Sequence, residues 1–215
     1  MAKQNDLRNV RRDYESMGIT KSDLAEDPFA QFDAWLKEAI DADVFDATAM
    51  TLATADSGGV PSARVVLLKH FDENGFCWYT DSRSQKGTDL AQNPSAALLF
   101  YWREFSRQIR IVGEVSPLSP TAADEYFYQR PEGSRFSAAS SHQTSEIDNR
   151  AALETRVKEL MTQYPDGSVP RPDAWIGYCL KPREFEFWQG KSNRLHDRII
   201  YLPTERAWRK TRRSP

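Results

Sequence analysis

Cysteine and histidine are scarce in this sequence, which contains two cysteines and three histidines. Cys77 and Cys179 stand in apolar, strand-like surroundings and lack the paired spacing of metal sites and disulfide frameworks. We therefore expect both to be inert core residues. The histidines, His70, His142 and His196, are not spaced as metal ligands either, so no metal site is predicted.

The sequence also lacks any long apolar run. No stretch reaches the roughly 18 uninterrupted apolar residues that a membrane helix needs, and the charged first residues lack the apolar centre of a signal peptide. We expect a cytoplasmic protein without a membrane partner. The formal net charge is −2 at pH 7, so the chain has no overall field that would attract nucleic acid or an anionic membrane.

Two kinds of catalytic signature are missing as well. There is no glycine-rich phosphate loop of the dinucleotide or Walker type and no G-x-S-x-G nucleophile elbow, so hydrolase and nucleotide-kinase functions lose support. A basic C-terminus could indicate a nucleic-acid contact, but a short solvated tail is commoner and no aromatic stacking platform accompanies it. The basic residues there are Arg206, Arg209, Lys210, Arg212 and Arg213.

Aromatic residues, in contrast, are plentiful, with six Trp, eight Tyr and eleven Phe. Hydrophobic residues make up 40% and charged residues 28% of the chain, a composition typical of a packed globular protein. Residues 1–21 are polar and show little apolar periodicity, so we expect a partly mobile N-terminal arm. Residues 22–215 contain nothing that resembles a linker and are predicted to form a single domain.

Apolar spacing and capping residues predict four helices. In the first, the Asp27 carboxylate can cap the helix with Pro28 at its first position, and apolar residues then recur at helical spacing before Val44. Pro131 should stop the third helix. The predicted helices cover 28–43, 84–92, 121–129 and 145–163.

Short runs rich in β-branched and aromatic residues, separated by turn residues such as Asn93-Pro94, predict strands. Their regular, close spacing favours an antiparallel meander or barrel. We therefore expect a mainly β fold with flanking helices. The predicted strands cover 49–54, 63–70, 75–80, 96–102, 108–115, 175–181, 185–189 and 194–202.

Three basic residues, Arg194, His196 and Arg198, alternate in the last predicted strand and should project from one face. Their mutual repulsion is tolerable if the face is solvated, or if it meets an anion or an electron-rich ring. We favour the second arrangement, because apolar residues lie opposite and Trp188 stands just across the turn. The alternative is a solvent-facing edge whose charges discourage aggregation.

A second cluster surrounds the end of the helix predicted at 121–129. Tyr126 and Arg130 lie four residues apart and face the same way, and the turn after Pro131 can bring Ser134 beside them. A phenol, a guanidinium and a hydroxyl that converge can bind a phosphate. The alternative is that Tyr126 and Arg130 simply stack on a surface helix.

Arg64 and Lys69 belong to one predicted strand, where strict alternation places them on opposite faces. Both can line one site only if the strand bulges or Lys69 lies beyond its end. Gln108, Gln143 and Thr144 are uncharged hydrogen-bonding groups that could read the edge of a heteroaromatic ring, although the sequence alone does not distinguish them.

In this order, the segments resemble the pyridoxine/pyridoxamine 5′-phosphate oxidase family from Arg11 to Pro215. The most specific part of the resemblance is Arg194-Leu195-His196-Asp197-Arg198. The other matching parts are Arg64 to Lys69, Tyr79-Thr80, Arg107-Gln108, Tyr126-Phe127, Arg130-Pro131 and Glu186-Phe187-Trp188-Gln189-Gly190.

The resemblance implies an FMN-binding split β-barrel and a homodimer with FMN in clefts between the subunits. It assigns the cofactor to Arg64, Val65, Val66, Leu67, Leu68, Lys69, Tyr79, Thr80, Gln85, Lys86, Gln108, Gln143, Thr144, Trp188 and Arg198. It assigns the substrate to Arg11, Arg12, Tyr14, Lys69, Tyr126, Arg130, Ser134, Arg194 and His196. Of these, Arg194 and His196 would be the catalytic residues, and residues 11–14 would belong to the arm that closes over the site.

The implied reaction oxidises pyridoxamine or pyridoxine 5′-phosphate to pyridoxal 5′-phosphate. The flavin N5 atom accepts a hydride from the 4′ carbon, and oxygen then regenerates the flavin and yields hydrogen peroxide. Rival functions are a related flavin enzyme acting on phenazine precursors, a non-catalytic flavin-binding protein and a small nucleic-acid-binding barrel. A phenazine precursor lacks a phosphate, so the intact set of phosphate-binding residues argues against the first rival.

Two positions depart from the pattern that the resemblance leads us to expect. Ser84-Gln85-Lys86 stands where the family usually has Ser-Arg-Lys, so one cationic contact to the FMN phosphate becomes an uncharged amide. Either FMN binds more weakly or nearby Arg83 compensates. Thr144 stands where a serine is common, and this exchange keeps the hydroxyl.

Overall fold

The computed structural model describes Asn9, Asp13, Tyr14 and residues 16–215. Arg11 and Arg12 therefore lie outside the described residues. The helices are α1 (Pro28–Asp41), α2 (Gln85–Gln92), α3 (Pro120–Gln129), α4 (Glu132–Ser140) and α5 (Arg150–Gln163), with 3-10 turns η1 (Arg103–Phe105) and η2 (Ser192–Arg194). The strands are β1 (Ala49–Ala55), β2 (Pro61–Leu67), β3 (His70–Asp72), β4 (Gly75–Asp81), β5 (Ser95–Trp102), β6 (Arg107–Pro117), β7 (Trp175–Gln189), β8 (Asp197–Pro203) and β9 (Trp208–Arg213).

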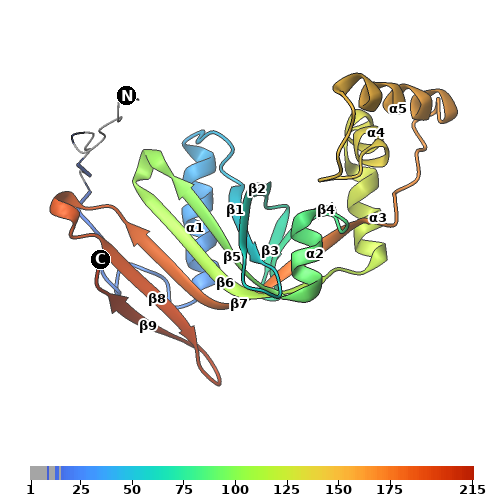
Figure 1. Cartoon of the computed structure of the whole chain (residues 1–215). Helices are drawn as coiled ribbons and strands as arrows, with labels where there is room; N and C mark the ends of the chain where they lie inside the picture. The colour runs from blue at the N-terminus through green and yellow to red at the C-terminus, as the bar shows by residue number, and fades with distance from the viewer. Residues whose placement is uncertain (1–8, 10–12, 15) are drawn as a thin grey trace, which may run out of the picture. The chain divides into compact units, whose positions relative to one another are not determined.

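The strands of the described chain form one hydrogen-bonded sheet (Figure 1). Its order is β2-β1-β5-β6-β7-β4-β3, with β8 pairing with β7 and with β9. Strand β1 pairs antiparallel with β2, β3 with β4, β4 with β7, β7 with β8 and β8 with β9. The predicted mainly β fold with flanking helices is confirmed.

Two compact units are built from these elements. Unit 1 contains the described residues up to 47 together with Leu99–Ile111 and Glu184–Pro215. Unit 2 contains Thr48–Leu98 and Val112–Arg183. Strands β5, β6 and β7 contribute residues to both units, and each unit is described by itself below.

Helix α1 supplies one side of the core of unit 1. It starts where the sequence predicts, because the Asp27 carboxylate accepts hydrogen bonds from the N–H groups of Phe29 and Ala30 at 2.8 and 3.0 Å. Its buried face places Phe32 against Phe100, with ring centroids 5.0 Å apart. Burial of a side chain of this size stabilises the fold by roughly 1.5–3 kcal/mol.

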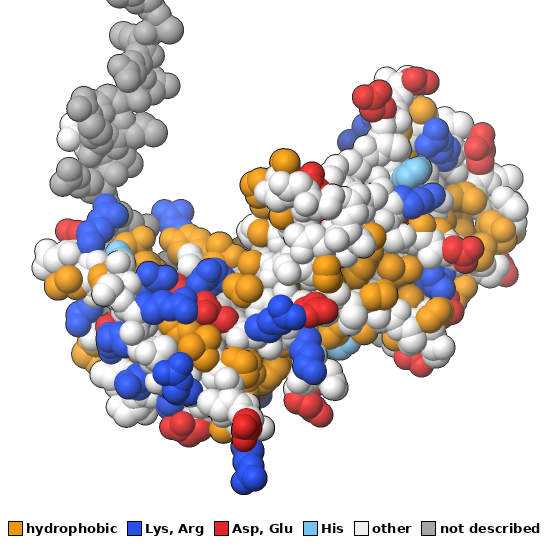
Figure 2. Space-filling view, turned by 60° about the horizontal axis from the view of Figure 1, so that its bottom comes forward, with side chains coloured by type: hydrophobic (Ala, Val, Ile, Leu, Met, Phe, Trp, Pro, Cys, Tyr) orange, Lys and Arg blue, Asp and Glu red, His pale blue; other side chains and the backbone are white. Residues whose placement is uncertain are grey.

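The basic C-terminal segment of unit 1 is a strand, so the prediction of a short solvated tail is wrong. The Lys210 ammonium is held by the backbone carbonyls of Lys21 and Leu24, both at 2.9 Å, and by the Glu26 carboxylate at 2.7 Å. Arg212 donates to the Ile19 carbonyl at 2.9 Å and pairs with Asp197. Figure 2 shows blue basic side chains interspersed with red acidic ones over β8 and β9. Their partners are far away in sequence, and charge composition alone does not reveal them.

Unit 2 carries α2 to α5 and differs from the sequence-based prediction in two helices. Helix α4 occupies residues that were expected to form only a turn. Helix α5 begins at Arg150 instead of Ser145, because the Asn149 side chain accepts from the Ala152 N–H at 2.9 Å and caps the helix there. Helices α4 and α5 pack against each other (Figure 1).

Strand lengths also differ from the prediction. The runs predicted at 175–181 and 185–189 are one continuous strand, β7, and the last predicted strand begins at Asp197 instead of Arg194. Strand β2 ends at Leu67, three residues before its predicted end. Strands β3 and β9 were not predicted from the sequence.

A close approach of β6 to β7 in unit 2 makes Gly113 a sensitive position. A Cβ atom at Gly113 would lie 2.1 Å from the Lys181 carbonyl oxygen, and backbone cannot move aside as a flexible side chain can. We expect Gly113→Ala to lower the free energy of unfolding by about 1–3 kcal/mol, as overpacking does. The measurement is urea denaturation followed by fluorescence.

The matched control is Gly133→Ala in α4. A Cβ at Gly133 meets no heavy atom within 4 Å, and alanine is the better helix former, so stability should stay level or rise. Equal stability of the Gly113→Ala variant and the native protein would contradict the strand spacing described here.

Candidate active site

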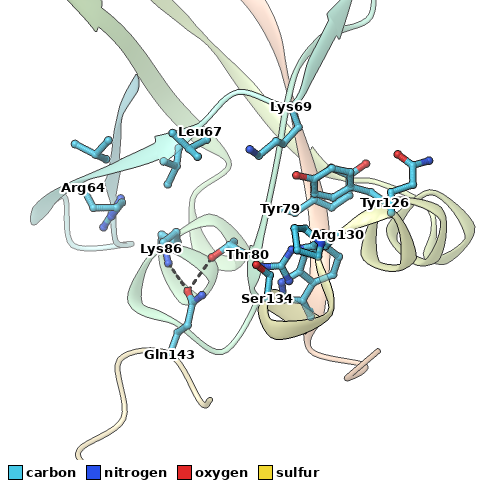
Figure 3. A pocket seen from close by; sticks show the side chains of 15 residues that line it. Arg64, Leu67, Lys69, Tyr79, Thr80, Lys86, Tyr126, Arg130, Ser134 and Gln143 are labelled. Atoms are coloured by element: carbon cyan, nitrogen blue, oxygen red, sulfur yellow. Dashed lines mark hydrogen bonds between the residues drawn. The ribbon is translucent and has the colours of Figure 1, made fainter. Parts of the chain in front are cut away.

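A cavity of about 580 Å³ in unit 2 collects most of the polar residues that the sequence analysis selected there. It is lined by side chains from β2 and β4, from the first turns of α2 and α4 and from the last turn of α3 (Figure 3). Its lining residues are Arg64, Val65, Val66, Leu67, Lys69, Tyr79, Thr80, Lys86, Tyr126, Gln129, Arg130, Pro131, Ser134, Gln143 and Trp175.

The end of β2 explains how Arg64 and Lys69 reach the same cavity. Strict alternation would separate them, but the strand ends at Leu67 and Lys69 lies beyond it. This is one of the two arrangements that the sequence left open. The Arg64 guanidinium donates to Thr54 Oγ1 at 2.8 Å and to the Leu52 carbonyl at 3.1 Å. Burial lowers the pKa of Arg64, and the Asp89 carboxylate 3.9 Å away opposes that shift.

Helix α2 begins at the cavity and contributes Lys86 from its first turn. The Lys86 ammonium donates to Ser84 Oγ at 3.0 Å and to Gln143 Oε1 at 2.9 Å, and Thr80 Oγ1 donates to the same amide oxygen at 2.9 Å. Burial lowers the pKa of Lys86, and the nearby Arg64 charge lowers it further. The protein supplies neutral oxygens to this ammonium, so its positive charge is solvated but not neutralised by them.

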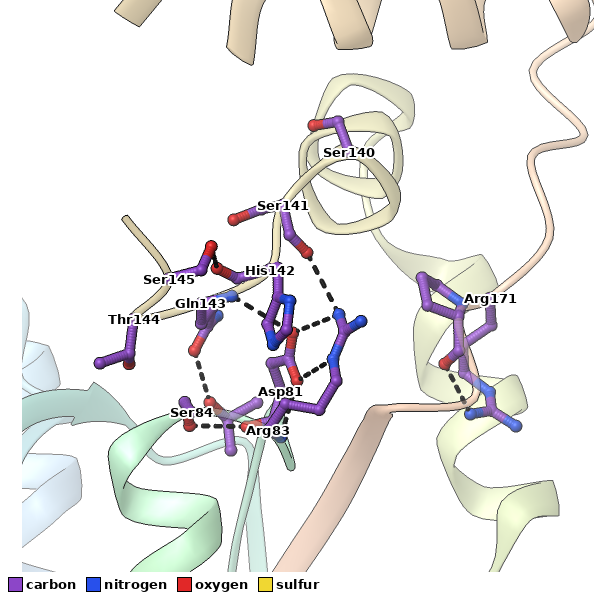
Figure 4. Close-up of polar contacts among 12 residues, drawn as sticks. Asp81, Arg83, Ser84, Ser140, Ser141, His142, Gln143, Thr144, Ser145 and Arg171 are labelled. Atoms are coloured by element: carbon purple, nitrogen blue, oxygen red, sulfur yellow. Dashed lines mark hydrogen bonds and ion pairs between the residues drawn. The ribbon is translucent and has the colours of Figure 1, made fainter. Parts of the chain in front are cut away.

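Asp81 at the end of β4 fixes the loop that carries Gln143 (Figure 4). Its carboxylate, almost fully buried, accepts from Arg83 Nε at 3.0 Å and Nη2 at 2.7 Å, and from the Gln143 N–H at 3.3 Å. Burial alone would raise the pKa of Asp81, but the hydrogen bonds from Arg83 and Gln143 outweigh it and hold the pKa below its usual value. Nothing in the sequence other than a polar residue ending a strand pointed to Asp81.

The predicted convergence of Tyr126, Arg130 and Ser134 is present in the structure. Arg130 stands just past the end of α3, and its guanidinium lies over the Trp175 ring, 5.0 Å from the centroid. Its Nη1 atom is buried and has no hydrogen-bond partner. Burial lowers the pKa of Arg130. A buried donor without a partner is costly, which favours an acceptor supplied by a ligand.

An aromatic wall lies beside this group in unit 2. The Tyr79 ring stacks on Tyr126, with centroids 4.3 Å apart, and on Trp175 at 5.3 Å. Burial first, and then the neighbouring Cys77 and Tyr126, raise the pKa of Tyr79 to about 12. The phenol therefore stays neutral at physiological pH. Trp175 was predicted only as the start of a strand, and its part in this wall was missed.

Three residues of unit 2 that the resemblance assigned to the cofactor do not line the cavity. Leu68 is buried, and the Gln85 side chain donates to Asp89 Oδ1 at 2.7 Å. The Thr144 hydroxyl accepts from the Gln85 N–H at 3.3 Å. The structure also directs Arg83 to Asp81 instead of the cavity, so Arg83 does not take the place of the missing arginine at position 85.

The remaining candidates lie in unit 1, and their arrangement corrects one prediction. Arg194 and His196 do not alternate in a strand with Arg198, because Asn193 and Arg194 adopt left-handed φ angles of 55° and 61° and turn the chain before β8. Only Arg198 lies in the strand. Its guanidinium binds the buried Glu186 carboxylate at 3.0 and 2.9 Å, and Glu186 also pairs with Arg110 at 2.8 Å. Arg198 is therefore already engaged by a carboxylate of the protein.

His196 instead joins an aromatic cluster of unit 1. Its ring lies 4.7 Å from the Trp188 ring and 5.4 Å from the Tyr14 ring, measured between centroids. Burial, followed by the Arg194 charge, lowers the pKa of His196 from its usual 6.5, which favours the neutral imidazole at neutral pH. Its Nδ1 atom accepts from the Lys191 N–H at 3.1 Å, so the neutral ring carries its proton on Nε2.

Gln108 also belongs to unit 1, where it lies on β6. None of the helices in the described part of the chain is long and apolar enough to cross a membrane. Within the same residues, no group of three or more His, Cys, Asp or Glu side chains is arranged to hold a metal ion.

Comparison with protein families gives two matches that together span most of the chain. The family described as pyridoxamine 5′-phosphate oxidase matches residues 36–164. The region described as the pyridoxine 5′-phosphate oxidase C-terminal dimerisation region matches residues 175–215.

Curated relatives match along nearly their whole length. A protein of Paraburkholderia phymatum named pyridoxine/pyridoxamine 5′-phosphate oxidase is 50% identical over 210 residues, which are 97% of this chain and 99% of the relative. A protein of Idiomarina loihiensis with the same name is 44% identical over 211 residues, 98% of this chain and 100% of the relative.

Two solved structures share the fold. PhzG from Burkholderia lata, in complex with tetrahydrophenazine-1-carboxylic acid, is 33% identical with a TM-score of 0.87, and the match covers 95% of this chain and 100% of PhzG. A pyridoxamine 5′-phosphate oxidase-related, FMN-binding protein from Nostoc punctiforme is 18% identical with a TM-score of 0.71, and the match covers 89% of this chain and 100% of that protein. At that identity the second match shows the fold alone.

The antiparallel sheet and its flanking helices thus define a protein of the split β-barrel class, as the sequence predicts. The chain belongs to the pyridoxine/pyridoxamine 5′-phosphate oxidase family, and it is an oxidoreductase.

The buried Asp81 carboxylate should make the order of the Gln143 loop depend on pH. Folding lowers the pKa of this carboxylate from its unfolded value of 3.8. Its stabilising contribution is therefore complete above pH 3.8 and disappears as the pH falls through the lower pKa of the folded state. We expect hydrogen-exchange protection of the Gln143 amide to stay level down to pH 3.8 and to fall below it.

Asp81→Asn should remove this step and lower protection of the loop about tenfold at neutral pH, since bonds to charged groups contribute about 1.5–3 kcal/mol and Arg83 is partly exposed. The matched control is Asp33→Asn, which removes the exposed Asp33–Lys37 pair and should leave the loop unchanged. Native protection in the Asp81→Asn loop would show that this carboxylate does not order it.

Proposed function

We propose that this protein binds FMN and oxidises pyridoxamine or pyridoxine 5′-phosphate at the 4′ carbon to pyridoxal 5′-phosphate, as part of vitamin B6 metabolism. One observation carries the proposal. The cavity of unit 2 is lined by two groups of cationic and uncharged hydrogen-bonding side chains, one around Lys86 and one around Arg130, and each group could bind a phosphate (Figure 3). A flavin mononucleotide and a pyridoxal-type substrate each bring one phosphate.

The donor set around Lys86 fits the FMN phosphate. Arg64 and Lys86 supply positive charge, and Thr80 and Gln143 supply uncharged hydrogen-bonding groups beside them. Gln85 points to Asp89 and adds no contact, so the phosphate would depend on Arg64 and Lys86. The exposed Val65 and the half-exposed Leu67 offer an apolar edge for the ring system.

The donor set around Arg130 fits the phosphate of the substrate. The Arg130 Nη1 atom is buried without a partner, and Lys69, Tyr126 and Ser134 line the same cavity. A phosphate there would supply the missing acceptor and would discriminate strongly against a substrate without one, because these groups would then remain unpaired.

When bound, FMN would supply the hydride acceptor for the oxidation, with oxygen as the final electron acceptor. The chain itself would then have to orient the ring of the substrate and control its protonation. We propose that Arg194 and His196 do this, with His196 neutral and presenting its Nε2 proton to an acceptor on the substrate. Tyr14 packs against His196 and would hold the imidazole ring in place.

A homodimer is part of the proposal. Residues 175–215 match a dimerisation region, and that region contains Trp188, Arg194, His196 and Arg198. We propose that FMN binds at the dimer interface, as the resemblance implies. The closing movement of the N-terminal arm and the cytoplasmic location remain predictions from the sequence.

The second candidate function is that of a flavin enzyme acting on phenazine precursors. One observation favours it, the 33% identity to PhzG over nearly the whole chain. PhzG was solved with tetrahydrophenazine-1-carboxylic acid, which carries a carboxylate and no phosphate. The Arg130 Nη1 atom, buried without a hydrogen-bond partner, and the neighbouring Lys69, Tyr126 and Ser134 favour a phosphorylated substrate.

An anaerobic spectrum separates these functions. The purified protein reconstituted with FMN should lose its flavin absorbance when pyridoxamine 5′-phosphate is added without oxygen, and should recover it with release of pyridoxal 5′-phosphate when air is admitted. Pyridoxamine without the phosphate should leave the spectrum nearly unchanged at the same concentration. A bound flavin that no phosphorylated substrate bleaches would exclude the proposed oxidase.

Two substitutions should separate the two phosphate sites. Arg130→Ala should raise KM for pyridoxamine 5′-phosphate about 10- to 100-fold, the equivalent of about 1.5–3 kcal/mol, and leave FMN affinity unchanged. Lys86→Ala should weaken FMN by a similar factor, measured by flavin fluorescence quenching, and leave KM unchanged once FMN is saturating. If both variants affect the same ligand, the assignment of two sites is wrong.

A further inference from the structure

Two cysteines of unit 2 have no part in the proposed function. Cys77 on β4 and Cys179 on β7 are free and buried, with 3% and 9% of their surface exposed. The antiparallel register of β4 and β7 makes them direct partners. The sequence showed no spacing that would suggest a pair, because the two residues meet only through the sheet.

The hydrogen bonds around this ladder show which kind of antiparallel pair the cysteines form. The Ser82 N–H donates to the Ala174 carbonyl at 2.7 Å. Ser82 and Ala174 are therefore a hydrogen-bonded pair, and they lie one step beyond the pair Asp81 and Trp175. Hydrogen-bonded and non-hydrogen-bonded pairs alternate along a ladder. Cys77 and Cys179 stand five steps away and are therefore a non-hydrogen-bonded pair.

Neighbouring strands confirm this assignment. The Cys77 carbonyl accepts from the Lys69 N–H at 2.9 Å and so turns away from β7. Gly177 lies two residues before Cys179 on β7, so the backbone groups of both point to the same side of the strand. The Gly177 carbonyl accepts from the Leu118 N–H at 2.9 Å and therefore points away from β4. Non-hydrogen-bonded partners have Cα atoms about 4.5 Å apart and side chains on the same face. A disulfide needs a Cα separation of about 4.4–6.8 Å, so this pair meets the requirement without strand movement.

The immediate surroundings give the two sulfur atoms different roles. The interaction between the two thiols lowers the pKa of Cys179 and raises that of Cys77, and the Cys179 thiol also donates to the Asn74 carbonyl at 4.0 Å. Since the thiolate is the nucleophilic form, the lowered pKa favours Cys179 as the sulfur that attacks a peroxide first. Tyr79 lies two residues from Cys77 on the same face of β4 and lines the cavity.

We propose that Cys77 and Cys179 are a redox-active pair that a peroxide converts into a cross-strand disulfide. The Cys179 thiolate attacks one oxygen of hydrogen peroxide, the O–O bond breaks, and the sulfur becomes a sulfenic acid. The other oxygen leaves as hydroxide, which takes up the proton that Cys179 released and becomes water. The Cys77 sulfur then displaces the sulfenic hydroxyl as a second water, and the S–S bond forms. The two thiols lose two electrons, and the peroxide gains them.

The oxidant connects this pair to the proposed function. An oxidase that returns electrons to oxygen releases hydrogen peroxide, and in this chain it would do so in a cavity lined by Tyr79, two residues from the buried Cys77 on β4. This link rests on the proposed function. The oxidation of the pair by added peroxide does not.

The test is therefore made with added hydrogen peroxide on the FMN-loaded protein, without substrate. After exposure, the protein is denatured, alkylated and digested. We expect both thiols to be lost together, a mass lower by two hydrogen atoms and a peptide that links Cys77 to Cys179, with dithiothreitol restoring both thiols. In Cys77→Ser, the Cys179 sulfenic acid should persist and be trapped by dimedone.

The opposite results would overturn the proposal. They are two alkylatable thiols after peroxide treatment, independent oxidation of each cysteine to higher acids, or a link that forms only after denaturation. If Cys77→Ser does not fold, the time course of the native protein still decides, because a disulfide requires equal rates of loss at both cysteines. Failure of the substrate assay would leave these results unaffected, so the two proposals can fail separately.

Discussion

Positive charge gathered in a half-buried cavity is the constraint that organises unit 2. Arg64 and Lys69 reach the cavity from β2 and the residues just after it, Lys86 from α2, and Arg130 from the end of α3. Burial lowers the pKa of Arg64, Lys86 and Arg130. The protein gives these groups mostly neutral oxygens, an aromatic face, or in one case a carboxylate 3.9 Å away. Like charges so placed raise the energy of the empty site, and the phosphates that we propose as ligands would lower it.

Strand ends make this arrangement possible. Strand β2 stops at Leu67 so that Lys69 can turn in, and β4 carries Tyr79 and Thr80 into the cavity before ending at Asp81. Asp81 then holds the loop that presents the Gln143 amide. Neutral and anionic groups of the protein thus hold the side chains of the cavity in position, and the cationic side chains remain available for ligands. The same β4–β7 ladder brings Cys77 opposite Cys179.

Much of the fold could be predicted from local patterns. The Asp27 cap, the Pro131 stop and the alternating strands depend on neighbouring residues and were recognised. The convergence of Tyr126, Arg130 and Ser134 was local as well. What could not be predicted depends on contacts distant in sequence or on turns of the backbone. Lys210 binds carbonyls nearly two hundred residues earlier in the chain. Left-handed φ angles at Asn193 and Arg194 turn the chain before β8, so Arg194 does not belong to that strand.

A crystal structure of the protein grown with FMN and pyridoxal 5′-phosphate tests most directly whether the cavity exists to hold two phosphates. The predicted result is one phosphate bound by Arg64 and Lys86 and a second that accepts from Arg130 Nη1, each within hydrogen-bonding distance. Cations that face only water in that crystal, with both ligands bound elsewhere, would contradict the proposed use of the cavity.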